Sequence, residues 1–130
     1  ATIAGWDILQ QQDQVRRLLG YCPQFDALLD LLTVREHLML YARIKGVPES
    51  RLEEVVRTKM AEMDLTQYEN RISSALSGGN RRKLSMAIAL VSEPPVVFAD
   101  EPSTGMDPKA RRSMWKIILR IARSKATSVV

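Results

Sequence analysis

One stretch of this sequence, from Leu76 to Asp107, constrains the fold more than any other. It begins with Ser77, Gly78 and Gly79, and the apolar residues that follow repeat at helical spacing. Because serine is a favoured N-cap residue, this pattern predicts a helix that starts at Ser77. The N-terminus of such a helix offers unpaired backbone N–H groups and a positive dipole end, and glycines allow a phosphate to come close.

A short apolar run, Val96 to Ala99, follows two prolines and ends in two acids, Asp100 and Glu101. The pattern predicts a strand that is buried on both faces and carries carboxylates at its carboxyl end. Open α/β sheets bind ligands at that end of their strands. We therefore expect an α/β fold with its site at this edge of the sheet.

Each of these pieces is common, but their order and short spacing resemble the signature motif, the Walker B motif and the D-loop of ATP-binding cassette (ABC) ATPases. The D-loop resemblance lies in Thr104 to Asp107. A further segment, Gly20 to Leu28, resembles the Q-loop of the A subfamily of ABC transporters, a group associated with lipid movement. The resemblance covers essentially the whole chain. It implies a P-loop NTPase-like ABC ATPase core with an inserted helical subdomain, truncated at both ends.

The resemblance implies roles for three residues in ATP hydrolysis. Gln24 would contact Mg²⁺ or the attacking water and report the nucleotide state to a transmembrane domain. Asp100 would hold Mg²⁺, and Glu101 would polarise the attacking water as general base. In the plainer alternative, Gln24 is a polar loop residue and both acids are solvated at the end of a strand. Phosphoryl transfer requires the two acidic roles side by side, which favours the catalytic interpretation.

The signature residues are expected to act on a neighbouring domain. By resemblance, Ser77, Gly78, Gly79 and Asn80 present a hydroxyl and backbone donors to the γ-phosphate of an ATP bound to the opposing domain. Asp107 would cross the same domain interface, and a role as helix N-cap is equally compatible with it.

Other polar residues receive no ligand role. The basic run from Arg81 to Lys83 is interpreted as a solvated helix face, because charge runs in exposed helices usually are. Cys22 is expected to be an inert, partly buried thiol without a basic partner. His37 lies far in sequence from the acids, so the family's switch-histidine role is not assigned to it.

Helix signals can be found on both sides of the signature. Thr33 and Glu36 form a capping-box pattern that predicts a helix start, and Gly46 is a plausible end of that helix. A second helix is expected from about Glu49 to Met63. Asp107 and the proline after it predict the start of the last helix, which has an apolar stripe of Met114, Ile117, Ile118 and Ile121. Leu19 to Cys22 is expected to form a short strand.

We expect three regions within one partial nucleotide-binding domain. Residues 1–32 would supply core strands and the Q-loop, residues 33–75 the helical subdomain, and residues 76–130 the signature, the Walker B motif, the D-loop and the following helix. The six glycines start no P-loop pattern, G-x-x-x-x-G-K-[ST]. The family places that motif upstream and the switch histidine downstream, so the chain is interpreted as a fragment.

In P-loop folds, the strand that carries the P-loop is expected to lie beside the Walker B strand, which is the strand at 96–99 here. Without the P-loop strand, the strand at 96–99 would lose a neighbour and leave backbone groups unpaired. The isolated chain is then expected to be poorly soluble or only partly folded, and not to bind ATP tightly.

The charge, the cysteine count and the length of the apolar runs limit the kinds of function that the chain can have. The chain has 19 basic and 15 acidic residues, a net charge of +4, and its basic residues are scattered without an aromatic platform, which disfavours nucleic-acid binding. The single cysteine excludes an internal disulfide and suits a reducing compartment. No apolar run is long enough to cross a bilayer and no signal peptide is evident, so any membrane location, at the cytoplasmic face, is expected to come from the parent transporter.

The leading hypothesis is an ATP-binding and ATP-hydrolysing segment of a lipid-transporting ABC protein. It would use ATP and Mg²⁺, a second nucleotide-binding domain in a head-to-tail pair, and the transporter's transmembrane domain. The alternative is a non-hydrolytic dimerisation or regulatory module that lends its signature to a partner site. A soluble ABC ATPase acting on ribosomes or DNA is disfavoured by the A-subfamily form of the Q-loop.

Overall fold

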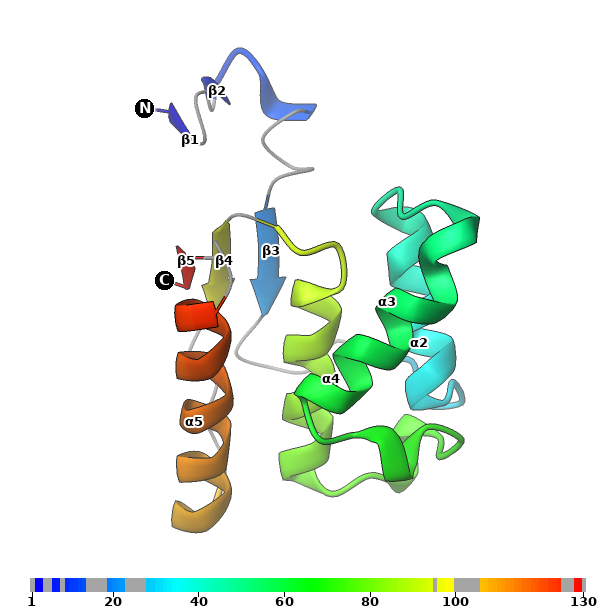
Figure 1. The fold of residues 1–130 in the computed structure, drawn as a ribbon. Helices are drawn as coiled ribbons and strands as arrows, with labels where there is room; N and C mark the ends of the chain where they lie inside the picture. The colour runs from blue at the N-terminus through cyan, green and yellow to red at the C-terminus, as the bar shows by residue number, and fades with distance from the viewer. Residues whose placement is uncertain are drawn as a thin grey trace.

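A computed structural model describes residues 2–3, 6–7, 9–13, 19–22, 28–94, 96–99, 106–124 and 128–129 (Figure 1). The elements in chain order are β1 (Thr2–Ile3), β2 (Trp6–Asp7), β3 (Leu19–Cys22), α2 (Val34–Ile44), α3 (Glu49–Glu62), the 3-10 helices η1 (Thr66–Tyr68) and η2 (Ser73–Ala75), α4 (Gly78–Leu90), β4 (Val96–Ala99), α5 (Pro108–Ser124) and β5 (Ser128–Val129). The mixture of helix and parallel strand is the α/β fold that the sequence predicts.

The main sheet has the order β3-β4-β5, and all three strands are parallel. β4 therefore pairs on both sides, with β3 along its whole length and with β5 at Val96 and Val97. The expectation that this strand would lack a neighbour is wrong. The positions on its two sides are filled by β3 and β5, so the absence of a P-loop strand leaves neither side empty. Burial on both faces is complete only at Val97, since the other three residues of β4 are partly buried.

Helix α2 begins at the capping box and ends before the glycine that the sequence predicts for its two ends. The Glu36 N–H donates to Thr33 Oγ1 (3.1 Å) and the Thr33 N–H donates to Glu36 Oε1 (3.0 Å), which completes the capping box. Gly46 follows the helix with a φ of +87°, a left-handed conformation that glycine adopts without strain.

One continuous apolar core joins α2, α3, α4 and α5. The expected apolar faces of α3 and α5 both lie in it: their buried members are Leu52, Val55, Val56, Met60 and Met63, and Met114, Ile117, Ile118 and Ile121. The helices between β3 and α4 therefore pack into the same core as the helix that follows β4. No helix in the described ranges is long and apolar enough to cross a membrane.

Gly20 is fixed by packing rather than by the turn around it. A Cβ added there would lie 2.2 Å from the backbone oxygen of Ala89 in α4 and 3.0 Å from Cγ of Pro94. The close approach of β3 to the end of α4 therefore requires glycine at this position.

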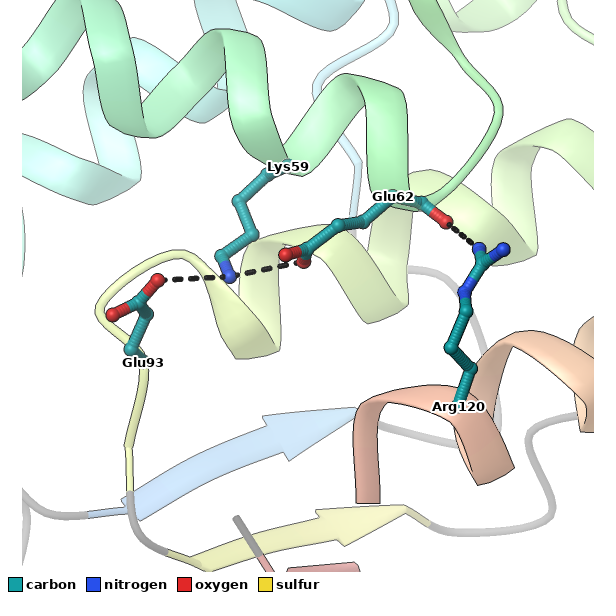
Figure 2. A network of polar contacts seen from close by, with 4 residues as sticks. All are labelled: Lys59, Glu62, Glu93 and Arg120. Atoms are coloured by element: carbon teal, nitrogen blue, oxygen red, sulfur yellow. Dashed lines mark hydrogen bonds and ion pairs between the residues drawn. The ribbon is translucent and has the colours of Figure 1, made fainter. Parts of the chain in front are cut away.

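A polar network around a buried lysine connects three segments that are far apart in the sequence (Figure 2). Lys59 of α3 is 1% exposed, and its Nζ lies 3.1 Å from Glu62 Oε2 and 3.4 Å from Glu93 Oε1. Arg120 of α5 donates to the backbone oxygen of Glu62 (3.0 Å). The end of α3 is thus linked to the loop after α4 and to α5.

Candidate functional site

Ser77 caps α4 as the sequence predicts. Its backbone is extended (φ −64°, ψ 161°), and its Oγ accepts a hydrogen bond from the Asn80 N–H at 3.2 Å. A hydroxyl that accepts at this position still has its own hydrogen to donate. The turn therefore offers one hydroxyl donor, together with the unpaired N–H groups of the first helical turn, to an incoming anion.

Neither glycine of this turn is needed for packing within the described chain. A Cβ added at Gly78 would meet nothing within 4 Å, and one at Gly79 would meet only Cβ of Ala110, at an ordinary 3.7 Å. Gly20, by contrast, could not carry a Cβ without a clash. The open space at the signature glycines fits an anion that approaches from outside this chain.

The first turns of α4 and α5 lie side by side, because Gly79 faces Ala110. Asp107 caps α5: its Oδ1 accepts from the Ala110 N–H at 2.7 Å. The N-cap role expected for Asp107 is confirmed, and its role at a domain interface stays a prediction. Both helix N-termini lie toward the end of the molecule to which β3 and β4 point (Figure 1).

The basic run after the signature differs from its expected solvated face. Arg82 is only 4% exposed, and its Nη2 lies 3.9 Å from Sγ of Cys22, which is fully buried. The expectation that Cys22 is partly buried and lacks a basic neighbour is therefore wrong. Arg81 is partly buried and donates to the backbone oxygen of Ser73 at 2.9 Å. The contact of Arg82 with Cys22 could not be predicted from the sequence, because it joins residues 60 positions apart.

Three predicted site residues, Gln24, Asp100 and Glu101, lie outside the described residues. The strands that precede them are described, and Cys22 pairs with Ala99, so β3 and β4 end at the same level of the sheet. Gln24 follows one strand end by two residues, and the acids follow the other directly. Among the described residues, no group of three His, Cys, Asp or Glu side chains could hold a metal ion.

His37 has a structural role. It is fully buried; the Leu29 N–H donates to Nε2 (2.9 Å), and Nδ1 lies 2.8 Å from the Thr33 carbonyl oxygen. Because a backbone N–H can only donate, Nε2 is the acceptor and Nδ1–H the donor of a neutral ring. Burial lowers the pKa of His37 below its ordinary value of 6.5.

The fold is that of ABC ATPase domains. CbiO1 from Clostridium perfringens, part of the cbiONQ ABC transporter complex, aligns over 90% of this chain and 47% of its own with a TM-score of 0.82 at 21% identity. An ATP-binding subunit of another ABC transporter aligns over 98% of this chain and 53% of its own, with a TM-score of 0.77 at 26% identity.

The ABC transporter family model matches residues 1–104, and the chain belongs to that family. It is 53% identical over 123 residues (95% of its length) to the bovine retinal-specific phospholipid-transporting ATPase ABCA4, and covers 5% of that protein. It is 47% identical over its whole length to the rat phospholipid-transporting ATPase ABCA3, and covers 8% of that protein. The mouse ATP-binding cassette sub-family A member 7 is 46% identical over the same span, which is 6% of its own length. The chain thus spans a small part of these relatives.

Proposed function

We propose that the chain is part of a nucleotide-binding domain that binds and hydrolyses ATP to drive lipid movement in an A-subfamily ABC transporter. Residues 1–32 and 76–130 would form the catalytic core, and residues 33–75 its helical subdomain. The observation that carries the proposal is the N-terminus of α4, where a serine cap and two sterically open glycines leave room for an anion.

In this proposal the signature completes a site on a second domain. Ser77 donates its hydroxyl hydrogen to the γ-phosphate of an ATP held by the opposing nucleotide-binding domain, and Gly78 and Gly79 allow the close approach. The dipole of α4 adds positive potential at the same place. Asp107, one helix away, contacts the opposing domain while it caps α5. The two domains therefore pair head to tail.

The acids after β4 carry the hydrolysis of the ATP bound to their own domain. Glu101 would orient the attacking water and accept its proton. Asp100 and Gln24 would hold Mg²⁺, which would supply positive charge to neutralise the phosphates. The level ends of β3 and β4 support this assignment, because the loops that carry Gln24 and the acids start from one edge of the sheet.

Two relatives support lipid as the transported substrate, since the bovine and rat proteins are named phospholipid-transporting ATPases. Movement of a lipid requires a membrane-spanning part, so the domain would work against the transmembrane domain of the same transporter, at the cytoplasmic face of the membrane.

The general-base assignment is tested with Glu101→Gln in the parent transporter. We expect phosphate release at the site that contains Glu101 to stop, while binding of ATP and pairing of the domains persist. Glu54→Gln, an exposed acid on α3, is the matched control and should leave both unchanged. Undiminished hydrolysis at that site in Glu101→Gln would refute the role.

A second variant tests whether the signature acts on the opposing site. Gly78→Gln places a neutral side chain in space that is open within the chain, so the fold should persist. Hydrolysis should fall at the site of the other domain and remain at the site that contains Glu101. If only the Glu101 site lost activity, the in-trans assignment would be wrong.

A further inference from the structure

A basic groove lies away from the signature, between the end of α3 and one side of α5. It has a volume of about 490 Å³. Its charged lining comes from Lys109, Arg112, Lys116 and Arg120 of α5, with Asp64 at the α3 side. These four cations follow one another at spacings of three and four residues, so they form a single stripe along the helix.

Three of the four cations have no partner in the described part of the chain. Lys109, Arg112 and Lys116 make no ion pair or side-chain hydrogen bond there, and all three are exposed. Arg120 differs, because it donates to the backbone oxygen of Glu62 (Figure 2). Within the described part of the chain, the positive charge of the stripe is therefore largely unpaired.

The stripe acts against the stability of its own helix. Like charges four residues apart, such as Arg112 and Lys116, repel each other. Apart from the capping carboxylate of Asp107, the first turn of α5 contains no acidic residue, and Lys109 lies there beside the positive end of the helix dipole, where cations are unfavourable. A local arrangement that opposes helix stability without an internal gain is a mark of a binding surface.

The groove continues into an apolar patch. Lys116 and Arg120 also line a neighbouring hollow with Leu119 and Arg123, in which apolar surface predominates. Leu119 is 50% exposed, although it lies on a helix whose opposite face is fully packed. The combined surface offers cations along one line and an aliphatic contact beside it.

We propose that this surface binds an acidic peptide segment of a partner protein, with carboxylates along the stripe and one apolar side chain on Leu119. From Lys109 to Arg120 the stripe spans about 16 Å, at about 1.5 Å per helical residue. An extended peptide of about five residues covers that length, at about 3.3 Å per residue. A concave groove accepts a narrow chain, whereas a flat bilayer would reach only its rim. The proposal is independent of the ATP site.

The test measures binding of a fluorescent ten-residue glutamate peptide with a central leucine to the complete nucleotide-binding domain of the parent transporter, by anisotropy. The double variant Arg112→Gln/Lys116→Gln should weaken binding about tenfold, as expected for two exposed ion pairs. The control, Arg51→Gln/Arg57→Gln, removes the same net charge from exposed positions on α3 and should change binding less than twofold. Circular dichroism should show the same helix content in both.

Two further probes distinguish the ligand. A peptide with glutamine in place of glutamate should not bind, and replacing its leucine by glycine should weaken binding. Equal weakening in the two double variants, or no binding of the glutamate peptide, would overturn the proposal. Binding of phosphatidylserine vesicles or of single-stranded DNA that depends on Arg112 and Lys116, in place of peptide binding, would also overturn it.

Discussion

Replacement of Lys59 by methionine should leave the free energy of unfolding within about 1 kcal/mol of the original, although it removes both ion pairs of a buried charge. Methionine has a similar length, so the aliphatic packing of the lysine stem is retained. The two carboxylates left behind are partly exposed, 19% for the Glu62 side chain and 49% for that of Glu93, and can turn to water. The reverse change, Glu62→Gln/Glu93→Gln, should be costly, because it leaves the ammonium buried without a countercharge.

The magnitudes follow from the distances. At 3.1 and 3.4 Å, Coulomb's law with an effective dielectric constant of about 20 gives roughly 5 kcal/mol of gross attraction for each pair. Removal of the ammonium and partial removal of both carboxylates from water cost several kcal/mol per ion, so attraction and desolvation nearly cancel for the intact network. When only the acids are neutralised, the desolvation cost remains. We expect a loss of about 2–4 kcal/mol, since hydrogen bonds to the amides recover part of the attraction.

Urea unfolding of the complete nucleotide-binding domain of the parent transporter at pH 7, followed by circular dichroism, measures both effects. The exposed pair of Arg43 and Glu49, with atoms 2.9 Å apart, supplies the control: Arg43→Met should change stability by less than about 1 kcal/mol. If Lys59→Met proved as damaging as the double glutamine variant, the balance between attraction and desolvation would be wrong, and the network would be a net source of stability.

Two further predictions concern other buried positions. Gly20→Ala should destabilise the chain by about 2–3 kcal/mol, because its Cβ would collide with the backbone of Ala89, whereas Gly78→Ala should not destabilise it. Comparison of their urea midpoints checks this, and equal midpoints would contradict it. Burial keeps the pKa of His37 below its unfolded value of about 6.5. The contribution of the buried, neutral ring to the free energy of unfolding is therefore complete above pH 6.5. It is lost as the pH falls below that value, because the unfolded state then binds the proton. His37→Gln should flatten the change in stability between pH 7 and pH 5.5, and an unchanged profile would exclude the histidine as its source.

Much of the helical framework could be predicted because its signals are local. The capping box at Thr33, the serine cap at Ser77 and the aspartate cap at Asp107 each depend on atoms within three residues of one another. Such contacts form almost regardless of the rest of the chain. The apolar stripe of α5 could also be predicted, since a period of 3.6 residues fixes which side chains share a face of the helix.

The candidate site was predictable only in part. The motif order pointed to Ser77–Asn80 and to the edge of the sheet, and the structure adds that the signature glycines are open while Gly20 is closed. Sequence alone could not separate these glycines, because the difference depends on which backbone comes near each of them. The same limit applies to Arg82. Its position in a charge run predicts that it is exposed to solvent, but in the folded chain it is buried beside Cys22.

The amino-acid order is enough to predict where the helices begin, which of their faces are apolar and which family the motifs resemble, because these features depend on hydrogen bonds and periodicity within a few residues. Tertiary structure alone decided the neighbours of β4, the burial of Lys59 and the exposure of the basic stripe on α5. Each of these results from segments that meet across tens of residues, and the free energy of such a contact depends on the surroundings that the rest of the fold creates.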